Sequence, residues 1–195
     1  MMPSAVLPTQ CAVALKEWAT VLRAMAHGEQ LVLIRKGGLI EPSTGFEVRR
    51  DTFLFYPTFE HQAVQYLHAP HQASFEEVLR QRAPEGQVRF DLAGVAVRAA
   101  TTTDPQLLTR LGAAHIYNEV FMTQRLKWQP DQPLTVVLVR AYRLVSPVTI
   151  PVAPHYAGCK SWVDLDAPVS LAGAVPVLDD AAFAVRTAPI LTLFG

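Results

Sequence analysis

Two cations and two glycines stand together at Arg35-Lys36-Gly37-Gly38. They end a short apolar, β-branched run, residues 30–35, which predicts a buried strand. Glycines let backbone N–H groups approach an anionic group closely, and the two cations would neutralise its charge. The pattern therefore indicates a phosphate-binding turn. The glycine spacings of the P-loop and of dinucleotide-binding loops are both missing, so a plain hairpin turn stays open as the alternative.

A carboxylate and an imidazole, Glu60 and His61, are neighbours in the segment Tyr-Pro-Thr-Phe-Glu-His-Gln, residues 56–62. Either group can accept a proton, so both are candidate catalytic residues of a small hydrolase, with Arg35 or Lys36 stabilising an anionic transition state. Two further histidines follow within twelve residues of Glu60. A proline between those two prevents a shared helical face, and no metal site is predicted.

Positive charge is concentrated between residues 122 and 162, where five cations stand against the single carboxylate of Asp131. Cations interleaved with aromatic residues are the combination that binds phosphates and stacks bases. The candidate ligand-binding residues of this segment are Lys127, Arg140, Arg143, Lys160 and Trp162. In the alternative interpretation, Arg140 and Arg143 flank a core strand and pair with acids.

Composition limits the class of protein. Half of the 195 residues are apolar and 17% are charged, which excludes a disordered chain and fits one folded domain. Lys plus Arg equals Asp plus Glu, so nucleic-acid binding would have to come from a local patch. The sequence has no signal-peptide pattern and no apolar run of about 18 residues. We therefore expect a cytoplasmic protein with no membrane partner.

Helical and strand patterns alternate along the chain. Strands are predicted at residues 30–35, 51–55, 87–101 and 134–145, the last continuing to 150. Helices are predicted at residues 10–27, 60–67, 74–82 and 104–126. The first two strands can pair as a long hairpin, so the sheet is expected to be mixed or antiparallel. These patterns predict an α+β domain with flanking helices over residues 1–166, and a proline-containing tail, 167–195, packed on it.

Three segments together resemble one bacterial family, the domain of unknown function 1802. They are ALKEWATVLRAMAHGEQLVLIRKGG at residues 14–38, FLFYPTFEHQ at 53–62 and YAGCKSWVDL at 156–165. The family has no assigned activity, so the resemblance implies none. It does imply that the Arg-Lys-Gly-Gly and Phe-Glu-His-Gln stretches are family hallmarks, and polar hallmarks on turns mark a site more often than a core.

A second resemblance concerns architecture. A helix, a Gly-Glu-Gln turn and a strand with a basic exit, residues 20–36, are similar to the opening of the pseudouridine-synthase-and-archaeosine-transglycosylase (PUA) barrels, particularly the ASC-1 homology (ASCH) type. This resemblance implies a small barrel with a cleft for RNA or a modified nucleotide.

Three functions from different classes follow. The first is a binding module for RNA, DNA or a phosphorylated small ligand, with Arg35, Lys36, Gly37 and Gly38 joining the cationic residues of the 122–162 segment. The second is the small hydrolase with Glu60 or His61 as general base. The third is a structural or protein-interaction domain. The sequence assigns no cofactor and leaves the oligomeric state open.

Overall fold

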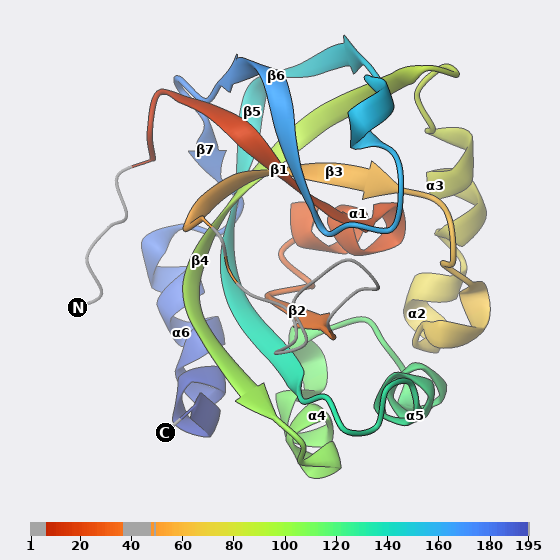
Figure 1. The fold of residues 1–195 in the computed structure, drawn as a ribbon. Coiled ribbons are helices and arrows are strands. Elements are labelled where there is room, and N and C mark those ends of the chain that lie inside the picture. The colour runs from red at the N-terminus through yellow and green to blue at the C-terminus, as the bar shows by residue number, and fades with distance from the viewer. Residues whose placement is uncertain (1–6, 37–47, 49, 195) are drawn as a thin grey trace.

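The computed structural model describes residues 7–36, 48 and 50–194, and these form an α+β fold built on a seven-stranded sheet (Figure 1). Six strands follow the order β2-β5-β4-β3-β1-β6, and β7 pairs with β5. The strands are β1 (Gln10–Trp18), β2 (Val32–Arg35), β3 (Thr52–Thr58), β4 (Gln87–Thr102), β5 (Leu134–Pro151), β6 (Trp162–Ser170) and β7 (Val175–Pro176). The helices are α1 (Ala19–Ala26), α2 (Ala69–Gln72), α3 (Phe75–Arg80), α4 (Pro105–Leu111), α5 (Glu119–Lys127) and α6 (Asp180–Leu191).

The sheet is mixed, as expected, because β1 and β3 run parallel whereas the other pairs are antiparallel. It is not a closed barrel, since β2 and β6 stand at the two ends of the strand order. The expected hairpin between residues 30–35 and 51–55 is wrong. A long connection does not fix strand pairing, and β2 aligns with the apolar first half of β5 instead, while β3 lies between β1 and β4.

The helix predicted at residues 10–27 is a strand in its first half and a helix in its second. Apolar residues two to four positions apart fit either structure, and pairing with β3 and β6 decides for the strand. Successive side chains of a strand point to opposite faces. Ala14 therefore belongs to one apolar core and Leu15 to the other, and the same alternation separates Lys16 from Glu17.

The predicted helix over 104–126 is interrupted after Leu111, where Gly112 has a φ of +46°, and α5 begins only at Glu119. Asp104 caps α4, because its side chain accepts a hydrogen bond from the backbone N–H of Gln106. The predicted helix at 60–67 is reduced to a 3-10 turn at Val64–Tyr66. Helix α6 was not predicted. Residue 166, the expected end of the first unit, lies within β6, and the division of the chain stays a prediction.

Two apolar cores cover opposite faces of the sheet. The larger holds Leu15, Phe53 and Phe55 with α1 and β2, and the smaller includes Leu54 and Tyr56. Helix α1 contacts β1, β3, β5 and α3, which places it inside the curve of the sheet (Figure 1). The strands therefore wrap around the N-terminal helix, and the ends of β1 and β3 come out beside it.

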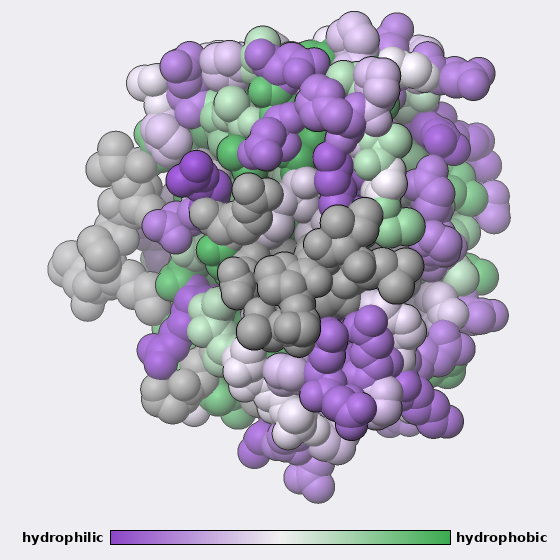
Figure 2. All heavy atoms as spheres, in the orientation of Figure 1, coloured by the Kyte–Doolittle hydropathy of each residue, from purple (hydrophilic) through white to green (hydrophobic). Residues whose placement is uncertain are grey.

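Hydrophilic residues predominate along the right-hand and lower rim of the face shown in Figure 2, and hydrophobic residues show between them mainly as separate patches. In the part of the chain that the structure describes, no helix has the length and apolar character needed to cross a membrane.

Candidate nucleic-acid-binding cleft

Arg35 joins the two ends of the open sheet. This last residue of β2 donates from Nη1 to the Lys16 carbonyl on β1 at 3.2 Å, and from Nη2 to the Ser161 hydroxyl, directly before β6, at 2.6 Å. Nη1 also lies 3.2 Å from the Glu17 carboxylate, whose side chain is only 4% exposed. Side-chain contacts of Arg35 thus link the two ends of the sheet, where a closed barrel would have backbone hydrogen bonds between neighbouring strands.

A large cleft opens beside this buried ion pair. It is open to solvent, has a volume of about 2140 Å³ and is lined by residues of β1, α1, β2, β3, α3, α5, β5, the start of β4 and the loop that precedes β6. Its described lining carries nine Lys and Arg side chains against five carboxylates. Pockets for drug-sized ligands enclose about 300–1,000 Å³. The cleft therefore has the size for an extended ligand and the charge for an anionic one.

Lys16 and Lys160 bring two ammonium groups into the cleft from different elements. Lys16 Nζ donates to the Gly158 carbonyl at 2.9 Å and lies 5.5 Å from the centre of the Tyr56 ring. Lys160 Nζ donates to the His155 carbonyl. Burial lowers the pKa of Lys16, and the charge of Lys160 lowers this pKa further. Neither lysine forms an ion pair with a carboxylate of the described chain.

Lys36 lines the same cleft, but its contacts are structural. Its side chain is almost fully buried, and Nζ donates to the carbonyls of Arg125 and Leu126, both at 3.1 Å. These carbonyls belong to the last turn of α5, where the helix dipole favours a cation. Burial, followed by the charge of Arg125, lowers the pKa of Lys36. Lys36 therefore fixes the end of α5.

The segment that follows β3 turns sharply at the cleft. Glu60 is 64% exposed and lies 3.7 Å from Arg82, and His61 has a φ of +63°, a left-handed conformation uncommon outside glycine. This turn directs Gln62 back to the start of α1, where its Oε1 accepts from the Thr20 N–H at 3.3 Å and from the Thr20 hydroxyl at 3.1 Å. The buried Nε2 of Gln62 has no hydrogen-bond partner among the residues that the structure describes.

The cleft brings together some of the residues expected from the sequence and not others. It is lined by Arg35, Lys36, Glu60, His61, Arg143 and Lys160. Arg143 donates to the Ala26 carbonyl at the end of α1. Arg140 lies elsewhere, beside Asp180 of α6 and the Phe183 ring. Trp162 is 6% exposed and packs edge-on against Phe53 in the core. Lys127 is exposed at the end of α5, and Gly37 and Gly38 lie outside the described residues.

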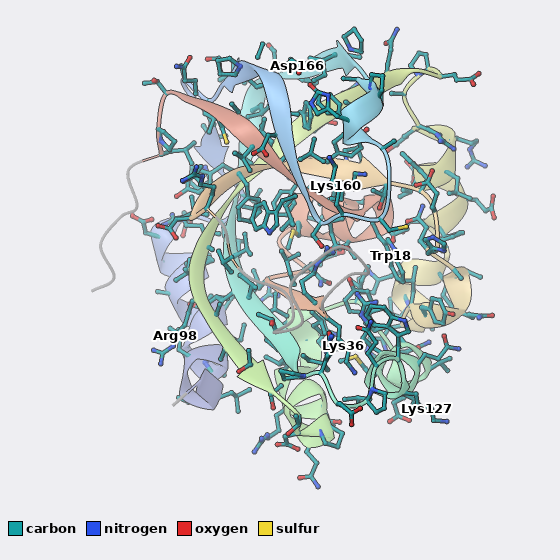
Figure 3. The ribbon with its side chains drawn as sticks, viewed as in Figure 1. Trp18, Lys36, Arg98, Lys127, Lys160 and Asp166 are labelled. Carbon is teal, nitrogen blue, oxygen red and sulfur yellow. The ribbon has the colours of Figure 1, made fainter. Side chains whose placement is uncertain are left out.

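Aromatic rings form another part of the cleft. Trp18 stacks on Tyr66 with ring centres 6.0 Å apart, and Phe121 meets Trp18 edge-on at 5.4 Å. The Tyr66 hydroxyl bonds to Gln124 of α5. In Figure 3, Trp18 and Lys127 lie towards the right-hand side of the molecule, Lys160 and Lys36 lie nearer its middle, and Arg98 lies towards the left. Cations and aromatic rings thus share one cleft.

Lys16 and Glu17, which line the cleft, were missed as site residues, and so was Gln62, which follows the lining residue His61. Lys16 and Glu17 fall in a segment whose pattern predicts a helix. The segment is a strand, so the two side chains point to opposite faces of the sheet, which a predicted helix does not indicate. Gln62 stands in the quoted Phe-Glu-His-Gln stretch, next to the residues chosen for their acid–base chemistry. No cluster of three metal-ligating side chains occurs within residues 7–36 and 50–194.

The chain belongs to the family described as a domain of unknown function, DUF1802, which matches residues 14–189. This match confirms the family expected from the sequence. A comparison with curated proteins gave no match. Among solved structures, the chain is similar to a serine-to-alanine mutant of ZmASCH from Zymomonas mobilis, with a TM-score of 0.41 and 13% identity over 97% of this chain and 100% of that chain.

Proposed function

We propose that the cleft binds nucleic acid through its phosphates. The observation that supports this most is the placing of Lys16 and Lys160 in one cleft, where no carboxylate among the described residues is bonded to either. Burial lowers the pKa of Lys16 most, and the neighbouring charge of Lys160 lowers it further, so holding both ammonium groups charged there is unfavourable. A phosphate between them would relieve that repulsion, and its oxygens would accept charge-assisted hydrogen bonds.

A nucleic acid fits this cleft better than a small phosphorylated ligand. The cations come from well-separated parts of the chain, among them Lys16 on β1, Arg125 on α5 and Arg143 on β5. A polynucleotide carries a phosphate at every residue and can contact several of these cations at once, whereas a ligand with one phosphate presents a single anionic group. The aromatic side chains in the lining, including Tyr66 and Trp128, suit bases rather than a lone phosphate.

The other functions expected from the sequence stay predictions. Glu60 and His61 both line the cleft, so a hydrolytic role for them is compatible with phosphate binding there. Such a role needs a bound substrate whose proton one of these groups can reach. The cytoplasmic location and the protein-interaction role also stay predictions.

The test is binding of a fluorescently labelled single-stranded oligonucleotide, followed by anisotropy at low salt. Lys16→Ala combined with Lys160→Ala should weaken binding about tenfold or more, because two charge-assisted contacts are removed. Arg110→Ala combined with Arg186→Ala is the matched control, since it removes the same charge from exposed residues outside the cleft lining. That control should change the affinity less than about threefold.

Equal weakening by the two double variants would show that bulk charge, and not the cleft, holds the oligonucleotide. Competition with inorganic phosphate and with a mononucleotide separates the two ligand classes. Displacement of the oligonucleotide by a mononucleotide at the same phosphate concentration would overturn the proposal in favour of a small ligand.

A further inference from the structure

Trp128 is the most exposed of the three tryptophans. It follows the last residue of α5, it is 39% exposed, and it lines the cleft. Trp18 is held between several aromatic rings, and Trp162 lies in the core. Large exposed aromatic side chains are costly in water, and beside a charged cleft they are typical of binding surfaces.

The ring of Trp128 is held in place from one side. The Arg125 guanidinium lies 5.7 Å from the centre of the Trp128 ring and 5.8 Å from that of Phe121, so it sits close to both rings. The backbone N–H of Trp128 donates to the Gln124 carbonyl at 3.0 Å, and Gln129 follows with a φ of +48°, a conformation that sharply redirects the chain.

Lys36 stabilises the same region, because its ammonium donates hydrogen bonds to two carbonyls in the last turn of α5. The base of this aromatic surface is therefore fixed before any ligand arrives. A ring that is already ordered loses little conformational entropy when a planar group stacks on it.

Positive charge near the Trp128 ring favours a planar ligand that also carries negative charge. Arg125 and Lys127 lie within three residues of Trp128, on the last turn of α5. A nucleobase is a planar group that carries a phosphate with it, so the base can stack on the indole while the phosphate meets a cation.

We infer that Trp128 is a stacking platform for an unpaired nucleobase, which makes the ligand of the cleft a single-stranded nucleic acid. In a duplex the bases are already stacked on one another, and their faces are not open to a protein ring. This inference rests on the proposed function, because phosphate binding in the cleft brings the strand to the ring.

The experiment compares three probes of equal length and charge per strand: a single-stranded oligonucleotide, an abasic strand with the same backbone, and a duplex. Wild-type protein should bind the base-bearing single strand about tenfold more tightly than the abasic strand, and more tightly than the duplex. Trp128→Ala should abolish the difference between the first two probes and leave the affinity for the abasic strand unchanged. Trp128→Phe, which keeps an aromatic face, should retain most of the difference.

Equal affinity of the wild-type protein for the base-bearing and abasic strands would overturn the inference while leaving phosphate binding intact. The same is true if Trp128→Ala weakens both strands equally, or if the duplex binds best. Failure of all three probes to bind at low salt would instead overturn the proposed function itself. Thermal melting of both variants shows that any change in affinity comes from a folded protein.

Discussion

The buried ion pair between Glu17 and Arg35 gives the sharpest prediction about the fold. In Glu17→Ala the Arg35 guanidinium, whose side chain is 13% exposed, loses the Glu17 carboxylate, and the backbone N–H of Trp18 loses the acceptor that lies 2.8 Å away. Removing one member of a buried ion pair costs about 3–5 kcal/mol, because the remaining charge keeps its desolvation cost and loses the attraction of that carboxylate. We expect Glu17→Ala to lower the free energy of unfolding by that amount.

The measurement is equilibrium unfolding in urea, followed by circular dichroism. Asp91→Ala is the matched control, because Asp91 also pairs with an arginine, Arg89, but both of these side chains are 52% exposed. Solvent screens such a pair, and its loss should cost no more than about 1 kcal/mol. A cost for Glu17→Ala as small as that of Asp91→Ala would refute the idea that Arg35 holds the ends of the sheet together.

Three further predictions follow. A Cβ at Gly94 would lie 2.8 Å from the buried rings of Phe53 and Phe55, so Gly94→Ala should lower the free energy of unfolding by about 1–3 kcal/mol in thermal unfolding. The control Ala99→Val, at an exposed position of the same strand, should lower it by less than about 0.5 kcal/mol. Equal losses in the two variants would contradict this packing. Lys36→Met removes two hydrogen bonds from the end of α5 and should speed amide hydrogen exchange there; unchanged exchange would show that the lysine does not cap the helix. Oligonucleotide affinity should fall as pH rises through the lowered pKa of Lys16, starting below the ordinary lysine value of 10.5, and Lys16→Arg should lessen this fall; an identical pH profile would exclude Lys16 from the phosphate contact.

The sign of this pH dependence follows from the two states of Lys16. Without ligand, burial and Lys160 disfavour the charged form and lower the pKa. A bound phosphate favours the charged form and raises the pKa, so binding takes up a proton in the pH range between the two values. Affinity therefore falls with rising pH, and an arginine, which keeps its charge there, removes that contribution.

The sequence predicts the regular parts of the fold well where one period dominates. The alternation of β4 and the long β-branched run of β5 were enough to place both strands, and Asp104 marked the start of α4. The pairing of β2 with β5 could not be predicted from the sequence, because the two segments lie about one hundred residues apart and the local residue pattern does not specify which strands pair. The strand β1 was mistaken for a helix because its apolar spacing suits both structures.

The candidate site was predicted in part for the same reason. Lys160 and Arg35 were identified by residue type, and the structure places both in one cleft. Lys36 was identified too, but its ammonium turned out to be bonded to the end of α5, a role that only the packed structure reveals. The grouping of Lys16 with Lys160 depends on the pairing of β1 with β6 and on the loop before β6, neither of which a pattern of residue types specifies.

The most direct test of the cleft as a phosphate-binding surface is the dependence of oligonucleotide affinity on salt concentration. Each phosphate contacted on a single strand contributes about 0.7 to the slope of the logarithm of the binding constant against that of the salt concentration. Lys16 and Lys160 hold one phosphate between them in this account, so loss of both lysines should reduce the magnitude of the slope by about 0.7. An unchanged slope in that double variant, with the slope falling instead in Arg110→Ala combined with Arg186→Ala, would contradict the account.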